Sequence, residues 1–164
     1  MSERNQQAEA ITAGRLQRAL SADLETLFRN DRFKTPDGGT APPKAYAQFL
    51  PRRESDDSED PFPYFIVRVE SGGVESPTAP HEVTVTVLVG IFDDDPENSG
   101  HFGVLEIIER IQRHYAETPA LGGATVSVPF HYALQDEESY PYFIGACSLT
   151  FQLPAPQSAW SEYT

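Results

Sequence analysis

The side chains best suited to chemistry form an acidic stretch near the middle of the chain. Asp95, Ser99 and Glu106 follow the spacing of a calcium-binding loop, and Glu97 falls at another of its ligand positions. Glu97 is long for that position, and a strand rather than a helix is expected before it. The simpler interpretation is an acidic helix N-terminus that Asp93 and Asp95 cap. We therefore expect no bound metal and no cofactor.

Nucleophiles and imidazole ligands are sparse. Cys147 is the single cysteine, and its neighbours in strand phase, Gly145 and Leu149, indicate a core position. The four histidines show no metal-site spacing, and neither a GxSxG nor a GxxxxGKS/T motif occurs. We therefore expect no catalytic residues. The alternative is a small cytoplasmic divalent-metal-binding domain or enzyme. Its site would consist of four acidic residues: Asp93, Asp95, Glu97 and Glu106.

Two segments show the apolar periodicity of amphipathic helices, over residues 8–29 and 99–116. In both, large apolar side chains recur at helical spacing and form one stripe. The stripe of the first helix consists of Leu16, Leu20, Leu24, Leu27 and Phe28, and that of the second of Phe102, Leu105, Ile108, Ile111 and Tyr115.

Four segments have the character of β-strands: 64–70, 82–92, 124–134 and 142–153. The second alternates strictly, with valine and isoleucine on one side. In the third, the apolar phase is set by Val126, Val128 and Phe130. The order predicts an α+β fold: a mostly antiparallel four-stranded sheet with two main helices packed on one face, in the order α-β-β-α-β-β. The edges of such a sheet offer unpaired backbone groups to neighbouring chains.

Residues 34–63 are predicted to form one long, proline-rich, acidic loop or arm. The segment holds six prolines and the acidic run 54–60. Proline fixes φ and lacks an N–H donor, which argues against a continuous helix or a central strand. Loops of this length are usually functional or disordered. Apolar residues in this loop and in the polar tail are candidate interface residues: Tyr46, Phe49, Leu50, Phe62 and Trp160.

The chain of 164 residues fits one domain, expected over residues 1–154 and followed by a tail at 155–164. Its net charge of −13 argues against gripping phosphate backbones, which requires clustered Lys and Arg. The single cysteine fits a reducing compartment. No segment has the character of a signal peptide or a membrane span. We therefore expect a protein that folds in the cytoplasm and binds other proteins, not a membrane.

Four segments follow one another in a distinctive order: FPYFIVRVESG (62–72), VGIFDDDPEN (89–98), GVLEIIERIQRHYAETPALGG (103–123) and YPYFIGACSLTFQLP (140–154). A strand closes in an Asp-rich turn, an amphipathic helix ends in a turn with paired glycines, and an aromatic strand ends in Leu-Pro. This combination resembles the tail-terminator, or tail-completion, proteins of long-tailed bacteriophages and prophages. The acidic run 54–60 and the Trp-bearing tail depart from the family pattern.

The resemblance implies a structural virion protein of the neck, assembled in the host cytoplasm. Its subunits would form a homo-oligomeric ring, typically a hexamer, that caps the head-proximal end of the tail tube and stops its polymerisation. The expected partners are the tail tube protein and a head-completion or connector protein. DNA would pass through the lumen without specific binding, and an acidic lumen, formed by residues 135–139 or 54–60, would repel its phosphates. The family has no catalytic residues.

Two related functions fit the same resemblance. One is a head-completion or connector-adaptor protein of the neck. The other is an adaptor in a phage-derived secretion or contractile device, which uses the same physical interactions in another setting.

Overall fold

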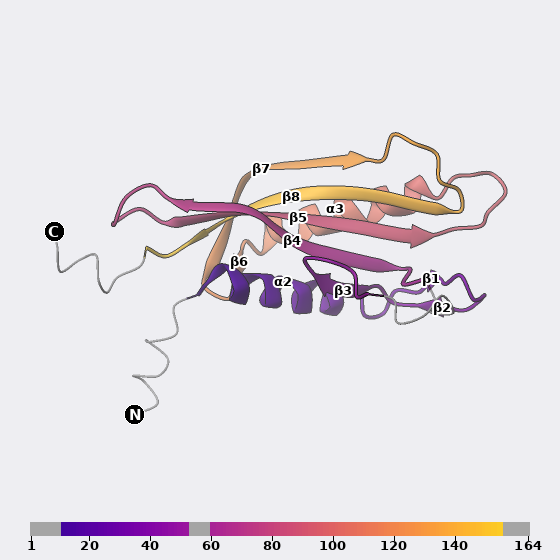
Figure 1. Cartoon of the computed structure of the whole chain (residues 1–164), viewed down its shortest axis with the longest axis horizontal. Helices are drawn as coiled ribbons and strands as arrows, with labels where there is room; N and C mark the ends of the chain where they lie inside the picture. The colour runs from indigo at the N-terminus through magenta and orange to yellow at the C-terminus, as the bar shows by residue number, and fades with distance from the viewer. Residues whose placement is uncertain (1–10, 53–59, 156–164) are drawn as a thin grey trace, which may run out of the picture.

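A computed structural model describes residues 11–52 and 60–155 of the chain (Figure 1). Within these ranges the backbone forms two helices and eight strands. The helices are α2 (Ala13–Leu27) and α3 (His101–Glu117), and the strands are β1 (Phe33–Lys34), β2 (Thr40–Ala41), β3 (Lys44–Ala47), β4 (Tyr64–Val74), β5 (His81–Phe92), β6 (Ala120–Leu121), β7 (Ala124–Leu134) and β8 (Tyr142–Leu153).

Six of these strands form one sheet in the order β3-β4-β5-β8-β7-β6, while β1 and β2 pair with each other. β3 runs parallel to β4, and every other neighbouring pair is antiparallel. β5 pairs with β8 along its whole length, from His81↔Leu153 to Phe92↔Tyr142. The sheet is therefore centred on two strands that are distant in the sequence.

The prediction of a four-stranded sheet is wrong. The sheet gains β3 and β6, which have only four and two residues and are too short to show side-chain alternation. β3 lies in the segment 34–63 that was predicted to be loop, as do β2 and the second residue of β1. Backbone pairing with β4, from Lys44↔Tyr64 to Ala47↔Val67, produces this strand. It lies at the sheet edge, where the prolines that precede it are tolerated.

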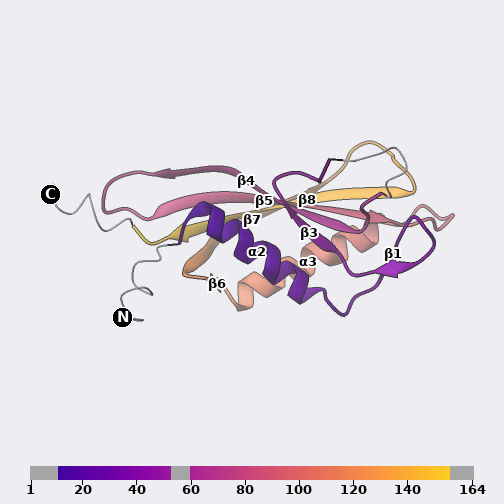
Figure 2. The ribbon, with the colours of Figure 1, turned by 60° about the horizontal axis from the view of Figure 1, so that its bottom comes forward.

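The prediction of two amphipathic helices is confirmed, and both cover the same face of the sheet (Figure 2). The stripe expected for the second helix is wrong at its start, because Phe102 is 64% exposed and Val104 is buried instead. α2 buries Leu16, Leu20 and Leu24, which recur at helical spacing. Burial of a side chain of this size stabilises the fold by about 1.5–3 kcal/mol. The strand residues of the same core alternate along β5 and β8, as the sequence predicts. Neither described helix combines the length and apolar character needed to cross a membrane.

The opposite face of the sheet carries an aromatic cluster. The ring of Phe62 lies 4.9 Å from that of Tyr64 and 4.7 Å from that of Tyr142, measured between centroids. Tyr64 crosses β5 at Gly90, where an added Cβ would lie 2.4 Å from its ring. A side chain at position 90 would therefore displace Tyr64 and open this end of the sheet.

Candidate interaction surfaces

The acidic turn before α3 is held by its own hydrogen bonds. The backbone N–H of Asp95 donates to Asp93 Oδ1 over 3.1 Å, and that of Glu97 donates to Asp95 Oδ1 over 3.0 Å. Glu106 lies on the exposed side of α3. Among the described residues, no three His, Cys, Asp or Glu side chains come together as metal ligands would. The calcium-like spacing of Asp95, Glu97, Ser99 and Glu106 therefore does not bring these residues together.

Asp93 and Asp95 do not cap α3, contrary to the prediction. Gly100 occupies the N-cap position, and no side chain accepts a hydrogen bond there. Lys34 Nζ instead lies 3.5 Å from Asp93 Oδ1 and 3.1 Å from Asp94 Oδ1, and the hydrogen bond to Asp94 raises the pKa of Lys34. These carboxylates therefore shape the turn and link it to β1.

Two further groups capable of chemistry are Cys147, which is buried, and Asp23, which is half-buried. Cys147 packs in the core, where burial raises the pKa of its thiol to about 12. Asp23 of α2 accepts hydrogen bonds from two residues of α3: Tyr115 Oη at 2.6 Å and His114 Nε2 at 3.0 Å. The first is a neutral core thiol at ordinary pH, and the second is a contact between the two helices.

The predicted interface residues have different environments. Tyr46 is half-buried beneath Lys44 Nζ, which lies 5.3 Å from its ring centroid. Leu50 is half-buried, and Phe62 belongs to the aromatic cluster. Phe49 is 69% exposed. Trp160 lies outside the described residues.

The first surface, here called the Phe49 patch, consists of Phe49 and Arg68 at the β3–β4 edge of the sheet. The Arg68 Cζ atom lies 5.5 Å from the ring centroid of Phe49, and Arg68 Nε donates to the carbonyl of Gln48 over 3.1 Å. Gln48 has a φ of 69°, in the left-handed region, and turns the chain at the end of β3. The patch therefore presents an aromatic ring and a guanidinium fixed by neighbouring backbone.

The second surface, here called the Val128 patch, consists of Val128 and Tyr132 on β7 at the other edge of the sheet. These side chains are 89% and 57% exposed. In the described residues β6 pairs with β7 at Ala124 and Thr125, and the Val126 N–H donates to the Pro119 carbonyl over 2.8 Å. The outer edge of β7 has no strand partner beyond Val126 in this part of the chain. The register of β7 against β8 shifts between Ser127 and His131. This irregularity breaks the alternation that predicted Val128 to lie in the apolar phase.

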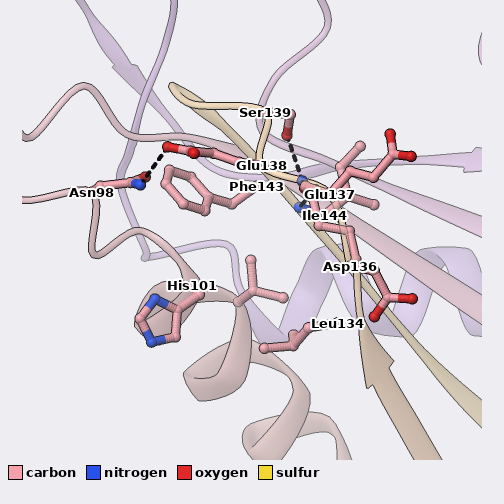
Figure 3. Close-up of a pocket in the computed structure, with 11 residues that line it drawn as sticks. Asn98, His101, Leu134, Asp136, Glu137, Glu138, Ser139, Phe143 and Ile144 are labelled. Atoms are coloured by element: carbon pink, nitrogen blue, oxygen red, sulfur yellow. Dashed lines mark hydrogen bonds between the residues drawn. The ribbon is translucent and has the colours of Figure 1, made fainter.

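A cavity of about 390 Å³ lies between the start of α3 and the turn joining β7 to β8 (Figure 3). Val104, Leu134 and Phe143 form its apolar floor. Polar side chains surround its mouth: Asn98, His101, Asp136, Glu137 and Glu138. The sequence predicted this acidic turn, residues 135–139, as a candidate for the lining of a lumen, but nothing local indicates that α3 lies opposite it.

No protein-family model matches the sequence, and no curated protein matches it significantly.

Proposed function

We propose that this protein is a ring-forming tail terminator, a structural subunit that caps the head-proximal end of a phage tail tube. It would stop tube polymerisation and provide the surface for head–tail joining. The proposal begins from the sequence resemblance. The observation that carries it further is that two different exposed patches, the Phe49 patch and the Val128 patch, lie at opposite edges of one sheet.

A chain with two unlike contact surfaces associates head to tail, and such contacts generate a ring when the rotation closes. Each copy would offer its Val128 patch to the Phe49 patch of the next copy. Aromatic residues and arginine are the side chains that most often carry the binding energy of protein interfaces. Phe49, Arg68 and Tyr132 are of these types.

The charge of the chain suits a channel for DNA. Each copy has a net charge of −13, so a ring of several copies would carry a large negative charge. Such a ring repels phosphate and lets DNA pass without being retained. In this role the tube protein and a head-completion or connector protein would bind the two ends of the ring.

The first test is the mass of the protein in solution, measured by light scattering over a range of concentrations. Six chains of 18.2 kDa give about 109 kDa, and we expect the wild-type protein to reach this mass. Added to purified, growing tail tubes, it should stop their growth and be visible at one end by electron microscopy. Binding to connector complexes alone would indicate a connector adaptor instead.

The head-to-tail arrangement has its own test. Phe49→Ser and Val128→Ser should each reduce the mass to that of a monomer, because each removes one of the two contact surfaces. Mixed together, they should form a pair of about 36 kDa, twice 18.2 kDa, through the one contact that remains intact. Val74→Ser, which removes another exposed valine in the β4–β5 hairpin, is the matched control and should leave the ring unchanged. Variants that keep the wild-type mass, or a mixture that forms no pair, would contradict this arrangement.

A further inference from the structure

The cavity beside α3 has the form of a receptor for one long side chain. Its volume of about 390 Å³ lies in the usual range of ligand pockets. Val104 and Phe143 at its floor are buried, and the polar side chains stand at its mouth (Figure 3). An apolar interior with a polar mouth suits lysine and arginine, because these residues bury an aliphatic stem and keep a charged head near water.

The turn that forms the mouth is fixed before any partner binds. Gln135 and Ile144 exchange two hydrogen bonds: the Gln135 N–H donates to the Ile144 carbonyl over 3.1 Å, and the Ile144 N–H donates to Gln135 Oε1 over 2.7 Å. Asn98 Nδ2 donates to Glu138 Oε1 over 2.8 Å, which connects the turn to the segment before α3. A preformed site of this kind loses little conformational entropy on binding.

The mouth is negatively charged. Asp136, Glu137 and Glu138 are consecutive, and within residues 11–52 and 60–155 none of them forms an ion pair with a basic side chain. The positive end of α3 offsets only about half a charge. No lysine or arginine follows Arg113 in the sequence, so β7, β8 and the turn between them supply no such cation of their own.

The opposite edge of the sheet carries exposed cations. Residues 38–52 contain no Asp or Glu, and they carry the exposed side chains of Lys44 and Arg52. Arg68 lies beside them in the Phe49 patch. Glu25 of α2 adds a carboxylate to this edge, where its Oε1 accepts a hydrogen bond from the backbone N–H of Ala45 over 2.9 Å, and the acidic run 54–60 follows Arg52 closely in the sequence. This edge therefore offers Lys44 and Arg52 as exposed cations that an acidic cavity can receive.

We infer that the cavity receives a basic side chain, Lys44 or Arg52, from the β3–β4 edge of a neighbouring copy. The inference rests on the head-to-tail ring proposed above and adds a charged contact to its apolar one. Complementary charges of this kind guide orientation and exclude wrong pairings. Such a contact would favour the head-to-tail orientation of neighbouring copies, which otherwise repel each other because each carries a net charge of −13.

A charge-swap experiment tests the contact. One variant carries Asp136→Lys and Glu137→Lys, and the other carries Lys44→Glu and Arg52→Glu. Glu138 and Arg68 are left unchanged because they hold neighbouring groups. Each variant alone should associate at least about tenfold more weakly than wild type, since like charges then face each other. An equal mixture should recover the wild-type mass, because the two chains can alternate around the ring.

The control carries Glu106→Lys and Glu109→Lys, which make the same change of charge on the exposed side of α3. It should retain the wild-type mass. A wild-type protein that stays monomeric would overturn both this contact and the proposed ring. An assembled wild type whose mass is unaffected by the swaps would overturn the contact alone. Loss of tube binding without loss of ring mass would assign the cavity to the tube protein and would also overturn it.

Discussion

Asp23 and Tyr115 join the two helices through a hydrogen bond that lies largely out of solvent. Tyr115 is 2% exposed, and its hydroxyl donates to Asp23 Oδ2 over 2.6 Å. Burial and this carboxylate both raise the pKa of Tyr115. A buried phenol needs such a partner because an unpaired hydroxyl would lose its hydrogen bond to water.

Tyr115→Phe should therefore lower the free energy of unfolding by about 1.5–3 kcal/mol, the usual contribution of a hydrogen bond to a charged group. Urea unfolding followed by circular dichroism measures the change. Tyr132→Phe removes a hydroxyl from an exposed tyrosine and is the matched control, with little expected effect. Equal effects of the two substitutions would contradict the role given to Asp23.

The buried thiol of Cys147 makes stability depend on alkaline pH. Its pKa rises from 9.0 in the unfolded chain to about 12 in the folded protein, because burial disfavours the thiolate. Between these values the unfolded state releases a proton that the folded state retains. The stabilisation from this difference is fully present below pH 9.0 and is lost as the pH rises toward about 12.

Cys147→Ala should consequently make the free energy of unfolding fall less steeply above pH 9, by up to about 1.4 kcal/mol per pH unit. Burial also raises the pKa of Tyr64 above its ordinary value, so the measured quantity is the difference between wild type and variant. Parallel pH profiles for the two proteins would show that Cys147 does not contribute.

At the scale of single residues, the sequence predicted the burial of side chains in regularly alternating strands better than the environment of isolated residues. Cys147 was expected in the core from its strand phase, and it is buried. Phe49 was chosen as an interface candidate; the structure exposes its ring, and the interface role stays a prediction. Val128 was assigned to the apolar phase of its strand, but the register shift in β7 turns it outward. Pro129 lies within this shift, and a proline inside a strand marks an edge or a bulge, so the sequence carried a signal that the alternation alone did not use.

At the scale of elements, Gln48 continues the edge of the sheet where β3 ends. The Val69 N–H donates to Gln48 Oε1 over 3.0 Å, and Gln48 Nε2 donates to the Val69 carbonyl over 3.2 Å. Gln17 Nε2 of α2 donates to the same Oε1 over 2.8 Å. One side-chain amide thus takes the place of the next strand residue and connects the edge to a helix.

Gln48→Ala should lower the free energy of unfolding by about 2 kcal/mol, since each lost hydrogen bond contributes about 0.5–1.5 kcal/mol. It should also speed hydrogen exchange at the Val69 amide, which loses its acceptor. Gln112→Ala, on the exposed side of α3, is the control and should change neither quantity. Unchanged exchange at Val69 would mean that backbone packing alone protects this edge.

The elements that the sequence did not predict are short strands, which form by backbone pairing with a neighbouring strand and show no side-chain alternation of their own. β3 and β6 are too short for a period, and proline-rich surroundings argue against a strand. β3 exists because α2 and β4 hold its place. The cavity beside α3 was also not predicted. It forms only where α3 packs near the turn between β7 and β8, and the sequence shows no pattern for that contact.

At the scale of the whole molecule, the two helices and the sheet share one core, which predicts a single cooperative unfolding transition. Reaction of Cys147 with a thiol reagent and far-UV circular dichroism should report the same urea midpoint, because the thiol is exposed only when the core opens. Both should be measured at one protein concentration, since assembly shifts the midpoint. Thiol exposure before the loss of dichroism would indicate that β7 or β8 detaches independently.

The pairing of β5 with β8 also determines when the protein can fold during its synthesis. β5 forms its ladder with β4 as soon as both have left the ribosome, but its other side stays open until residues 142–153 emerge. Until then the nascent chain exposes a long apolar strand edge, the kind of surface that aggregates or recruits chaperones. The centre of this sheet is therefore completed only when β8 pairs with β5, and translation interrupted before β8 would release a chain that cannot close its sheet.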